Sequence, residues 1–178
     1  STGCINSCSF CSVPAIYKQK WDHNKIENII NHLKEIISEN KEIKTIHFRD
    51  DNFLIKKSFV FKLFHELQKE NINFLWSCQT SVNILLRFKD EEIQQLYKYG
   101  CRNISFGVES GDKFILQKVT KSKTNKLQAI ELIKTLTKHN LSVSITSIIS
   151  FQYNKGRDFN KTLRFLMKLK LLYPQLSM

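Results

Sequence analysis

The chain has 178 residues, of which 42% are hydrophobic, and it carries a formal net charge of +12. A chain of this length can bury one substantial core, so we expect a single domain over residues 1–178. No stretch approaches the roughly 20 apolar residues of a membrane span, and we expect no membrane partner. The 28 Lys and Arg residues are dispersed, which favours a solvated basic surface, although a nucleic-acid partner stays open.

Apolar periodicity and turn residues predict helices and strands that alternate along the chain. In chain order, we expect a helix over 24–39, a strand over 44–48, a helix over 58–70, a strand over 73–77, a helix over 90–99, a strand over 102–106, helices from 112 and over 124–139, a strand over 142–149, and a helix over 158–172. Asn24 and Glu27 resemble a capping box for the first helix, and Gly100 suits a left-handed cap after the third.

The alternation of strand and helix at about 30 residues per unit predicts βαβ units and a parallel sheet. About five or six such units are too few for a closed eight-stranded barrel, which takes about 250 residues. The expected fold class is therefore α/β, a partial, open TIM-type (β/α) barrel with about five to six parallel βα units.

Chemically distinctive residues follow the predicted strands. They are Asp50, Asp51, Cys78, Gln79, Gly107, Glu109 and Gly111. Because active sites of parallel α/β proteins gather at the carboxyl ends of the strands, we expect these residues to share one rim. Taken singly, the two aspartates also fit a solvated turn or a helix cap, and Glu109 also fits an ordinary surface carboxylate.

Three cysteines, Cys4, Cys8 and Cys11, stand within eight residues of one another. This spacing lets one loop wrap three thiolates around a metal centre and leaves a fourth coordination position open. Buried free thiols are the alternative, which the polar loop disfavours. Cys78 and Cys101 are expected to be packed side chains or pocket lining. Clustered thiols fit a reducing compartment, so we expect a cytoplasmic protein.

The motif Cys4-x3-Cys8-Ser9-Phe10-Cys11 is similar to the signature of the radical S-adenosylmethionine (radical SAM) enzymes. The turn 50–53, Asp-Asp-Asn-Phe, and the block 99–111, followed by Leu116 and Lys121, resemble the subgroup often fused to a cobalamin-binding domain. The resemblance covers roughly residues 3–150 and implies a radical SAM core domain over 1–178. Because the chain begins almost on the cysteine motif, we expect a piece of a longer protein whose flanking domains are missing.

The resemblance implies a [4Fe–4S] cluster held by Cys4, Cys8 and Cys11, with S-adenosylmethionine (SAM) on the fourth iron. Phe10 would shield the cluster and lie near the adenine. Cobalamin, carried by an upstream domain, is a further expectation of the subgroup.

Three more SAM contacts follow from motif positions in the resemblance. Glu109 would bind the ribose hydroxyls, and Lys121 would pair with the SAM carboxylate. Asp51 would lie near the methionine amino group. Relatives commonly carry a Gly-x-Pro-Gly-Glu-Thr turn after the fifth strand, but residues 151–157 lack it, so no SAM contact is assigned there.

The implied reaction is reductive cleavage of SAM to a 5′-deoxyadenosyl radical, which abstracts hydrogen from a small-molecule or peptide substrate that the sequence does not identify. The expected partner is a reductase or a flavodoxin-type electron donor. No protein residue is assigned as a catalytic acid, base or nucleophile.

Two other functions stay open. A tRNA methylthiotransferase-type radical SAM enzyme would suit the positive charge and the sequence Cys11-Ser12-Val13-Pro14. A zinc-stabilised nucleic-acid-binding module could use the same three thiols with a distant fourth ligand such as Cys78 or Cys101.

Overall fold

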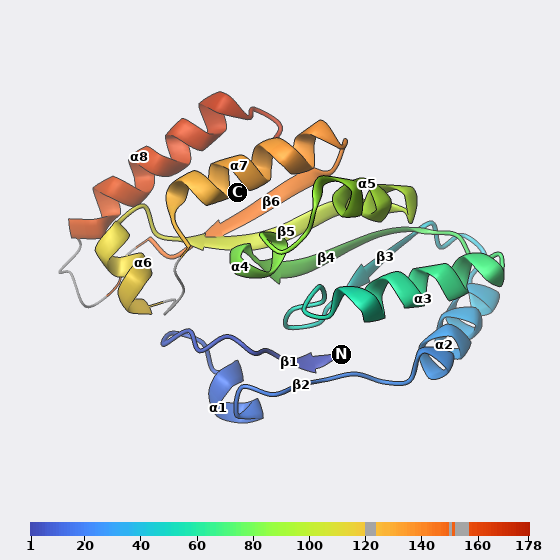
Figure 1. Cartoon of the computed structure of the whole chain (residues 1–178). Helices are drawn as coiled ribbons and strands as arrows, with labels where there is room; N and C mark the ends of the chain where they lie inside the picture. Colours follow the sequence, from blue (N-terminus) through green and yellow to red (C-terminus); the bar gives the residue numbers. More distant parts are fainter. Residues whose placement is uncertain (120–123, 150, 152–156) are drawn as a thin grey trace.

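Four parallel strands form the central sheet of the computed structural model, which describes residues 1–119, 124–149, 151 and 157–178 (Figure 1). In sheet order they are β3 (Thr45–Phe48), β4 (Leu75–Ser81), β5 (Cys101–Glu109) and β6 (Ser142–Ser147). A separate antiparallel pair joins β1 (Thr2–Gly3) to β2 (Trp21–Asp22). The described part of the chain thus has consecutive strands lying side by side, as successive βα units require.

Helices precede, connect and follow the parallel strands. They are α1 (Val13–Tyr17), α2 (Ile26–Glu39), α3 (Lys57–Lys69), α4 (Val82–Leu85), α5 (Asp90–Lys98), α6 (Lys113–Val119), α7 (Lys126–Lys138) and α8 (Arg157–Leu172). Helix α5 packs against β5, α7 packs against β6, and α2 packs against α3. The partial, open barrel-type α/β fold is confirmed, and Ser177 adds an isolated parallel bridge to Ser144 beside β6.

Three local predictions were wrong. Strand β5 continues to Glu109, so Gly107 and Glu109 lie inside the strand rather than after it. Strand β4 continues to Ser81, so Cys78 and Gln79 lie inside the strand rather than after it. The proposed capping box does not form, since α2 begins after Lys25 and has no side-chain cap. The cap at Gly100 is confirmed, because its φ of 92° lies in the left-handed region that glycine tolerates.

The two faces of the sheet differ in polarity. One face packs against the helices and supplies buried residues to the core, among them Trp76, Cys78, Ile104, Phe106, Val143 and Ile145. The opposite face carries polar side chains at the alternating positions His47, Ser77, Gln79, Asn103, Ser105, Ser144 and Thr146, while Leu75, on the same face at the start of β4, is apolar. Parallel sheets are usually apolar on both faces. The polar face is therefore the inner wall of the open barrel, left free of a hydrophobic filling.

The core also explains the remaining cysteines. Cys78 and Cys101 are both fully buried among apolar side chains, as expected of packed thiols. Burial raises the pKa of Cys78 well above its ordinary value and also raises that of Cys101, so both thiols stay protonated. In the described residues, no helix is long and apolar enough to cross a bilayer.

Candidate cluster and SAM site

The three clustered cysteines lie on the loop between β1 and α1. In Figure 1 this blue segment is at the end of the sheet to which the arrowheads of β4, β5 and β6 point. The amide of Cys11 donates to the carbonyl oxygen of Cys8 over 3.2 Å, which closes a tight turn between these two thiols. Cys11 is exposed, whereas Cys4 and Cys8 are half-buried. The loop that carries the three thiols thus lies at the rim predicted from the strand ends.

Asn52 fixes the first cysteine from the turn after β3. This amide is 1% exposed and donates to Cys4 Sγ at 3.5 Å and to Ser81 Oγ at 3.0 Å. Its Oδ1 accepts a hydrogen bond of 2.7 Å from the Thr80 hydroxyl. A hydrogen-bonded amide beside a thiolate both orients the ligand and tunes the metal that it binds.

A second amide contact ties the middle of the cysteine loop to the end of β4. Asn6 donates to Ser81 Oγ at 3.0 Å and accepts from Asn83 Nδ2 at 2.8 Å. Ser81 therefore joins Asn52 and Asn6, so that one hydroxyl links the turn after β3 to the cysteine loop. Sequence reasoning missed Asn6, Asn52, Ser81 and Asn83; the only signal was the presence of small amides and hydroxyls at strand ends.

The acidic turn also holds the start of the loop. Asp51 Oδ2 accepts a hydrogen bond of 2.8 Å from the amide of Gly3, and Asp50 accepts from Ser1. Gly3 has a φ of 80°, and a Cβ atom there would lie 2.2 Å from the carbonyl oxygen of Lys20. Only glycine fits this position. The structure thus places Asp51 at the rim and gives one of its oxygens to the backbone that leads into Cys4.

Glu109 stands at the end of β5 in a strained conformation. Its φ is 56°, and the amide of Ser110 donates to the carbonyl oxygen of Val108 over 2.7 Å, so Glu109 is the central residue of a γ-turn with positive φ. The pairing of β5 with β6 also shifts register between Gly107 and Glu109. A non-glycine residue held in such a turn is a frequent mark of a functional site.

A small cavity of about 40 Å³ lies between Glu109 and the cysteine loop. Its lining includes Asn6 and Cys8 from the loop, Ser81, and Gly107 and Glu109 from β5. Burial raises the pKa of Glu109 to about 7. Burial, followed by the nearby negative charges of Glu109, Cys4 and Cys11, raises the pKa of Cys8 to about 11. In the metal-free chain these groups repel one another as anions, which a cation placed among the thiolates would relieve.

The other two predicted contacts have different outcomes. Phe10 is 42% exposed and meets the ring of Phe151 edge-on, with centroids 6.0 Å apart. The cysteine loop is thereby joined to the chain that follows β6. Lys121 lies outside the described residues.

The donor set fits a multi-iron cluster. Within the described ranges, no three His, Cys, Asp or Glu side chains are gathered around one point as ligands of a single ion. An iron–sulfur cluster binds each thiolate at a different iron, so Cys4, Cys8 and Cys11 on one loop would supply three of its four ligands. The residues present therefore match a cluster with three protein ligands.

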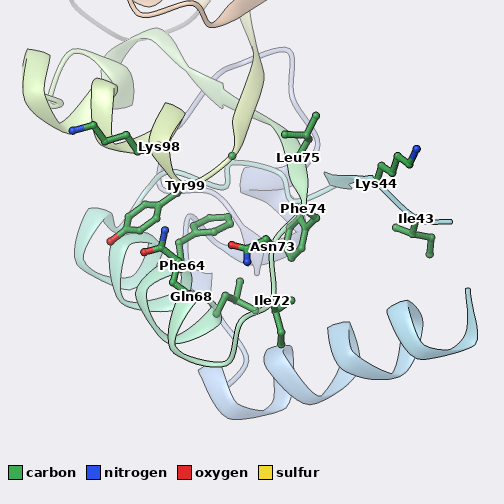
Figure 2. Close-up of a pocket in the computed structure, with 12 residues that line it drawn as sticks. Ile43, Lys44, Phe64, Gln68, Ile72, Asn73, Phe74, Leu75, Lys98 and Tyr99 are labelled. Atoms are coloured by element: carbon green, nitrogen blue, oxygen red, sulfur yellow. The ribbon is translucent and has the colours of Figure 1, made fainter. Parts of the chain in front are cut away.

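A cavity of about 450 Å³ is at the other end of the sheet (Figure 2). Phe64, Phe74 and Tyr99 line it together with Lys44 and Lys98, at the amino ends of β3, β4 and β5. It shares no lining residue with the cysteine cavity. This larger cavity is thus separate from the end of the sheet that carries the cysteines.

Known proteins with similar sequences match almost the whole chain. The chain is 28% identical over 177 residues to an uncharacterized methyltransferase of Pyrococcus horikoshii, covering 99% of this chain and 38% of the relative. It is 26% identical to the bacteriochlorophyllide d C-12(1)-methyltransferase of Chlorobaculum tepidum, with coverage of 99% and 38%. A tRNA-2-methylthio-N(6)-dimethylallyladenosine synthase of Clostridium novyi is 25% identical, with coverage of 94% and 38%. The chain therefore spans well under half the length of these relatives.

The fold has a close match among solved structures. TsrM from Kitasatospora setae, a radical S-adenosylmethionine methyltransferase solved with cobalamin and a [4Fe–4S] cluster, superposes with a TM-score of 0.78 at 14% identity, over 94% of this chain and 33% of that one. The profile of the Radical SAM superfamily matches residues 1–166. With its three cysteines on the rim of an open α/β barrel, the chain belongs to the Radical SAM superfamily.

Proposed function

We propose that Cys4, Cys8 and Cys11 hold a [4Fe–4S] cluster and that SAM binds beside it, between the cysteine loop and the end of β5. The observation that carries the proposal is the cavity lined by both Cys8 and Glu109. In this cavity Cys8, a proposed cluster ligand, and the carboxylate of Glu109, about 100 residues later in the chain, lie side by side. When bound, the cluster supplies the low-potential electron that cleaves SAM into methionine and a 5′-deoxyadenosyl radical, which abstracts hydrogen from the substrate.

Each side chain at the rim binds a different part of SAM. Glu109 accepts hydrogen bonds from the ribose hydroxyls, and these bonds are stronger when its carboxylate is ionised. Phe10 covers the cluster and contacts the adenine, while Asp51 keeps one oxygen for the methionine ammonium group and the other for Gly3. Lys121 pairs with the SAM carboxylate. The protein thus orients SAM and excludes water, as expected where a cofactor performs the difficult chemistry.

The polar inner face of the sheet favours a polar, uncharged substrate. Toward the carboxyl ends of β4 and β5, this face includes Ser81 and Gly107, which line the cavity beside Glu109. Closer to the amino ends of the strands, His47 forms a hydrogen bond of 2.7 Å with Ser77, and Asn103 donates one of 3.0 Å to Ser144. This face of the sheet therefore presents hydroxyl and amide groups. Deuterated nucleosides, sugars and amino-acid amides test this class, because abstraction from the true substrate transfers deuterium into 5′-deoxyadenosine.

Methyl transfer is the reaction class that two relatives favour, since their names describe methyltransferases. We propose that cobalamin, bound by an upstream domain, takes part in that reaction. The similar structure of TsrM also contains cobalamin. The electron comes from a reductase or a flavodoxin-type protein. We place the reaction in the cytoplasm, where reduced thiols persist.

The test uses full-length protein, reconstituted anaerobically with iron and sulfide and reduced with dithionite. Chromatography with mass spectrometry then quantifies 5′-deoxyadenosine and methionine formed from SAM. Replacing any of Cys4, Cys8 or Cys11 with alanine is expected to abolish both products, whereas Cys101→Ala, a matched cysteine in the core, is expected to retain them. Equal products from the Cys8→Ala variant would refute the assignment.

The methylthiotransferase alternative has one supporting observation, the likeness to the Clostridium novyi enzyme. It predicts a methylthio group on adenosine when tRNA is added to the same reaction. The zinc alternative predicts a colourless protein, since zinc has a filled d shell. Both suggested fourth ligands, Cys78 and Cys101, belong to the hydrophobic core and do not line the cavity beside Cys8.

A further inference from the structure

The strained turn at Glu109 needs support from outside β5. A γ-turn with positive φ is disfavoured for a residue with a side chain and persists only where neighbouring structure holds it. On one side, the carbonyl oxygen of Glu109 accepts a hydrogen bond of 2.8 Å from the amide of Ile148. On the other side, the three residues that follow Glu109 are held by helix α8, which is distant in sequence.

Thr162 of α8 is the centre of that support. Its Oγ1 accepts a hydrogen bond of 3.0 Å from the amide of Gly111 and lies 3.1 Å from the hydroxyl of Ser110. Ser110 Oγ in turn accepts from the amide of Asp112 at 3.1 Å. Ser110 is 0% exposed and Thr162 is 1% exposed, so water cannot replace either partner. One buried hydroxyl therefore satisfies the backbone directly after Glu109.

The approach of α8 to this turn is close enough to exclude any side chain. A Cβ atom at Gly111 would lie 2.3 Å from the carbonyl oxygen of Lys161 and 2.7 Å from the Cα of Thr162. Lys161 also donates to Asp112 Oδ2 at 2.6 Å, and this ion pair holds the pKa of Asp112 below its ordinary value. The turn and the helix are thus fixed to each other by backbone contact and by charge.

We infer that Thr162 is a positioning residue for SAM, which acts by holding the Glu109 carboxylate in place over Gly107. The inference rests on the proposed function, because Glu109 is there the ligand of the ribose. Thr162 itself faces Ser110 and Gly111 and is not among the residues that line the cysteine cavity. Its effect on SAM must therefore pass through the turn.

The test compares two substitutions in the full-length, cluster-loaded protein. Thr162→Val keeps the shape but leaves the buried amide of Gly111 without an acceptor, whereas Thr162→Ser keeps the hydroxyl. We expect Thr162→Val to weaken SAM binding about tenfold, equivalent to about 1.4 kcal/mol, and Thr162→Ser to stay within about threefold of wild type. Thr137→Val is the matched control, since the Thr137 hydroxyl bonds only backbone carbonyls of its own helix α7.

A double-mutant cycle with Glu109→Gln separates this role from a general structural one. If Thr162 acts through Glu109, Thr162→Val costs little further SAM affinity in the Glu109→Gln background. Amide hydrogen exchange of residues 107–112, measured without cluster or SAM, is also expected to be faster in Thr162→Val than in Thr137→Val.

The other possible results overturn either the positioning role of Thr162 or the assignment of Glu109 to the ribose. Suppose that Glu109→Gln weakens SAM binding. The positioning role alone is then overturned if Thr162→Val leaves SAM affinity or hydrogen exchange unchanged. It is also overturned if Thr162→Ser loses as much SAM affinity as Thr162→Val. A full effect of Thr162→Val in the Glu109→Gln background does the same. Normal SAM affinity in Glu109→Gln itself overturns the ribose assignment of the proposed function, and the positioning role with it.

Discussion

The carboxylate of Glu109 lies directly over Gly107, two residues earlier in the same strand. A Cβ atom built at Gly107 would be 1.9 Å from Glu109 Oε1 and 2.6 Å from Glu109 Cδ. The space that a side chain would fill is thus occupied by the group proposed to bind SAM. The glycine is needed here for close approach rather than for a special φ.

Gly107→Ala is therefore expected to displace the carboxylate while the fold survives, because the end of a glutamate side chain can swing away. We predict about a tenfold loss of SAM affinity, with iron content unchanged, measured by anaerobic equilibrium dialysis and iron analysis. Gly111→Ala is the contrasting variant, since its Cβ meets backbone atoms of α8 and should lower thermal stability. Full SAM affinity in Gly107→Ala would argue against this position of Glu109.

Glu109 should also give the metal-free chain a pH-dependent stability. Burial raises its pKa from an ordinary 4.5 to about 7, so the folded state retains a proton that the unfolded state has lost. The stabilising effect is present below about pH 4.5 and is lost as the pH rises through about 7. Glu109→Gln is expected to match wild type near pH 4 and to exceed it by about 3 kcal/mol near pH 8. Urea unfolding at several pH values measures this, and parallel profiles would contradict it.

Asn52 is expected to stabilise both the fold and the cluster. Asn52→Ala removes an amide that bonds Cys4, Ser81 and Thr80, and leaves a buried hydroxyl without its partner. We predict a loss of about 2–3 kcal/mol in unfolding free energy and faster removal of iron by a chelator. Asn31→Ala, on the exposed surface of α2, is the control; it should leave iron retention unchanged and change the unfolding free energy by less than about 1 kcal/mol. Wild-type iron retention in Asn52→Ala would show that the Cys4 contact is dispensable.

The two oxygens of Asp51 can be tested separately. Asp51→Asn keeps an oxygen acceptor for the amide of Gly3 but removes the negative charge, whereas Asp51→Ala removes both. We expect Asp51→Asn to retain wild-type iron content and to bind SAM about tenfold more weakly. Asp51→Ala should lose iron as well. If the asparagine variant binds SAM normally, Asp51 serves only the loop.

The sequence predicted the fold class and the rim because both depend on strong local signals. Apolar periodicity marked α3, α5 and α7, and parallel strands carry their carboxyl ends to one edge. Strand ends were less predictable. The predicted strand 73–77 continues to Ser81 because its last residues pair with β5, a tertiary contact that no local pattern records.

The supporting contacts of the site were beyond sequence reasoning for the same reason. Asn52 and Ser81 meet across 29 positions of the chain, and Thr162 meets Ser110 across 52. Small polar side chains occur in most loops, so only the folded chain distinguishes those that hold the site. The strain at Glu109 was equally hidden, because nothing in a glutamate predicts a positive φ.

The central claim is that three thiolates leave one iron of a cubane open to SAM. The most direct measurement is iron and sulfide analysis of the anaerobically reconstituted full-length protein, with electron paramagnetic resonance of its reduced form before and after SAM is added. We predict about four irons and four sulfides per chain and a spectrum that changes when SAM binds. A protein without a cubane, or a cubane whose spectrum ignores SAM because a fourth side chain caps it, would contradict the account.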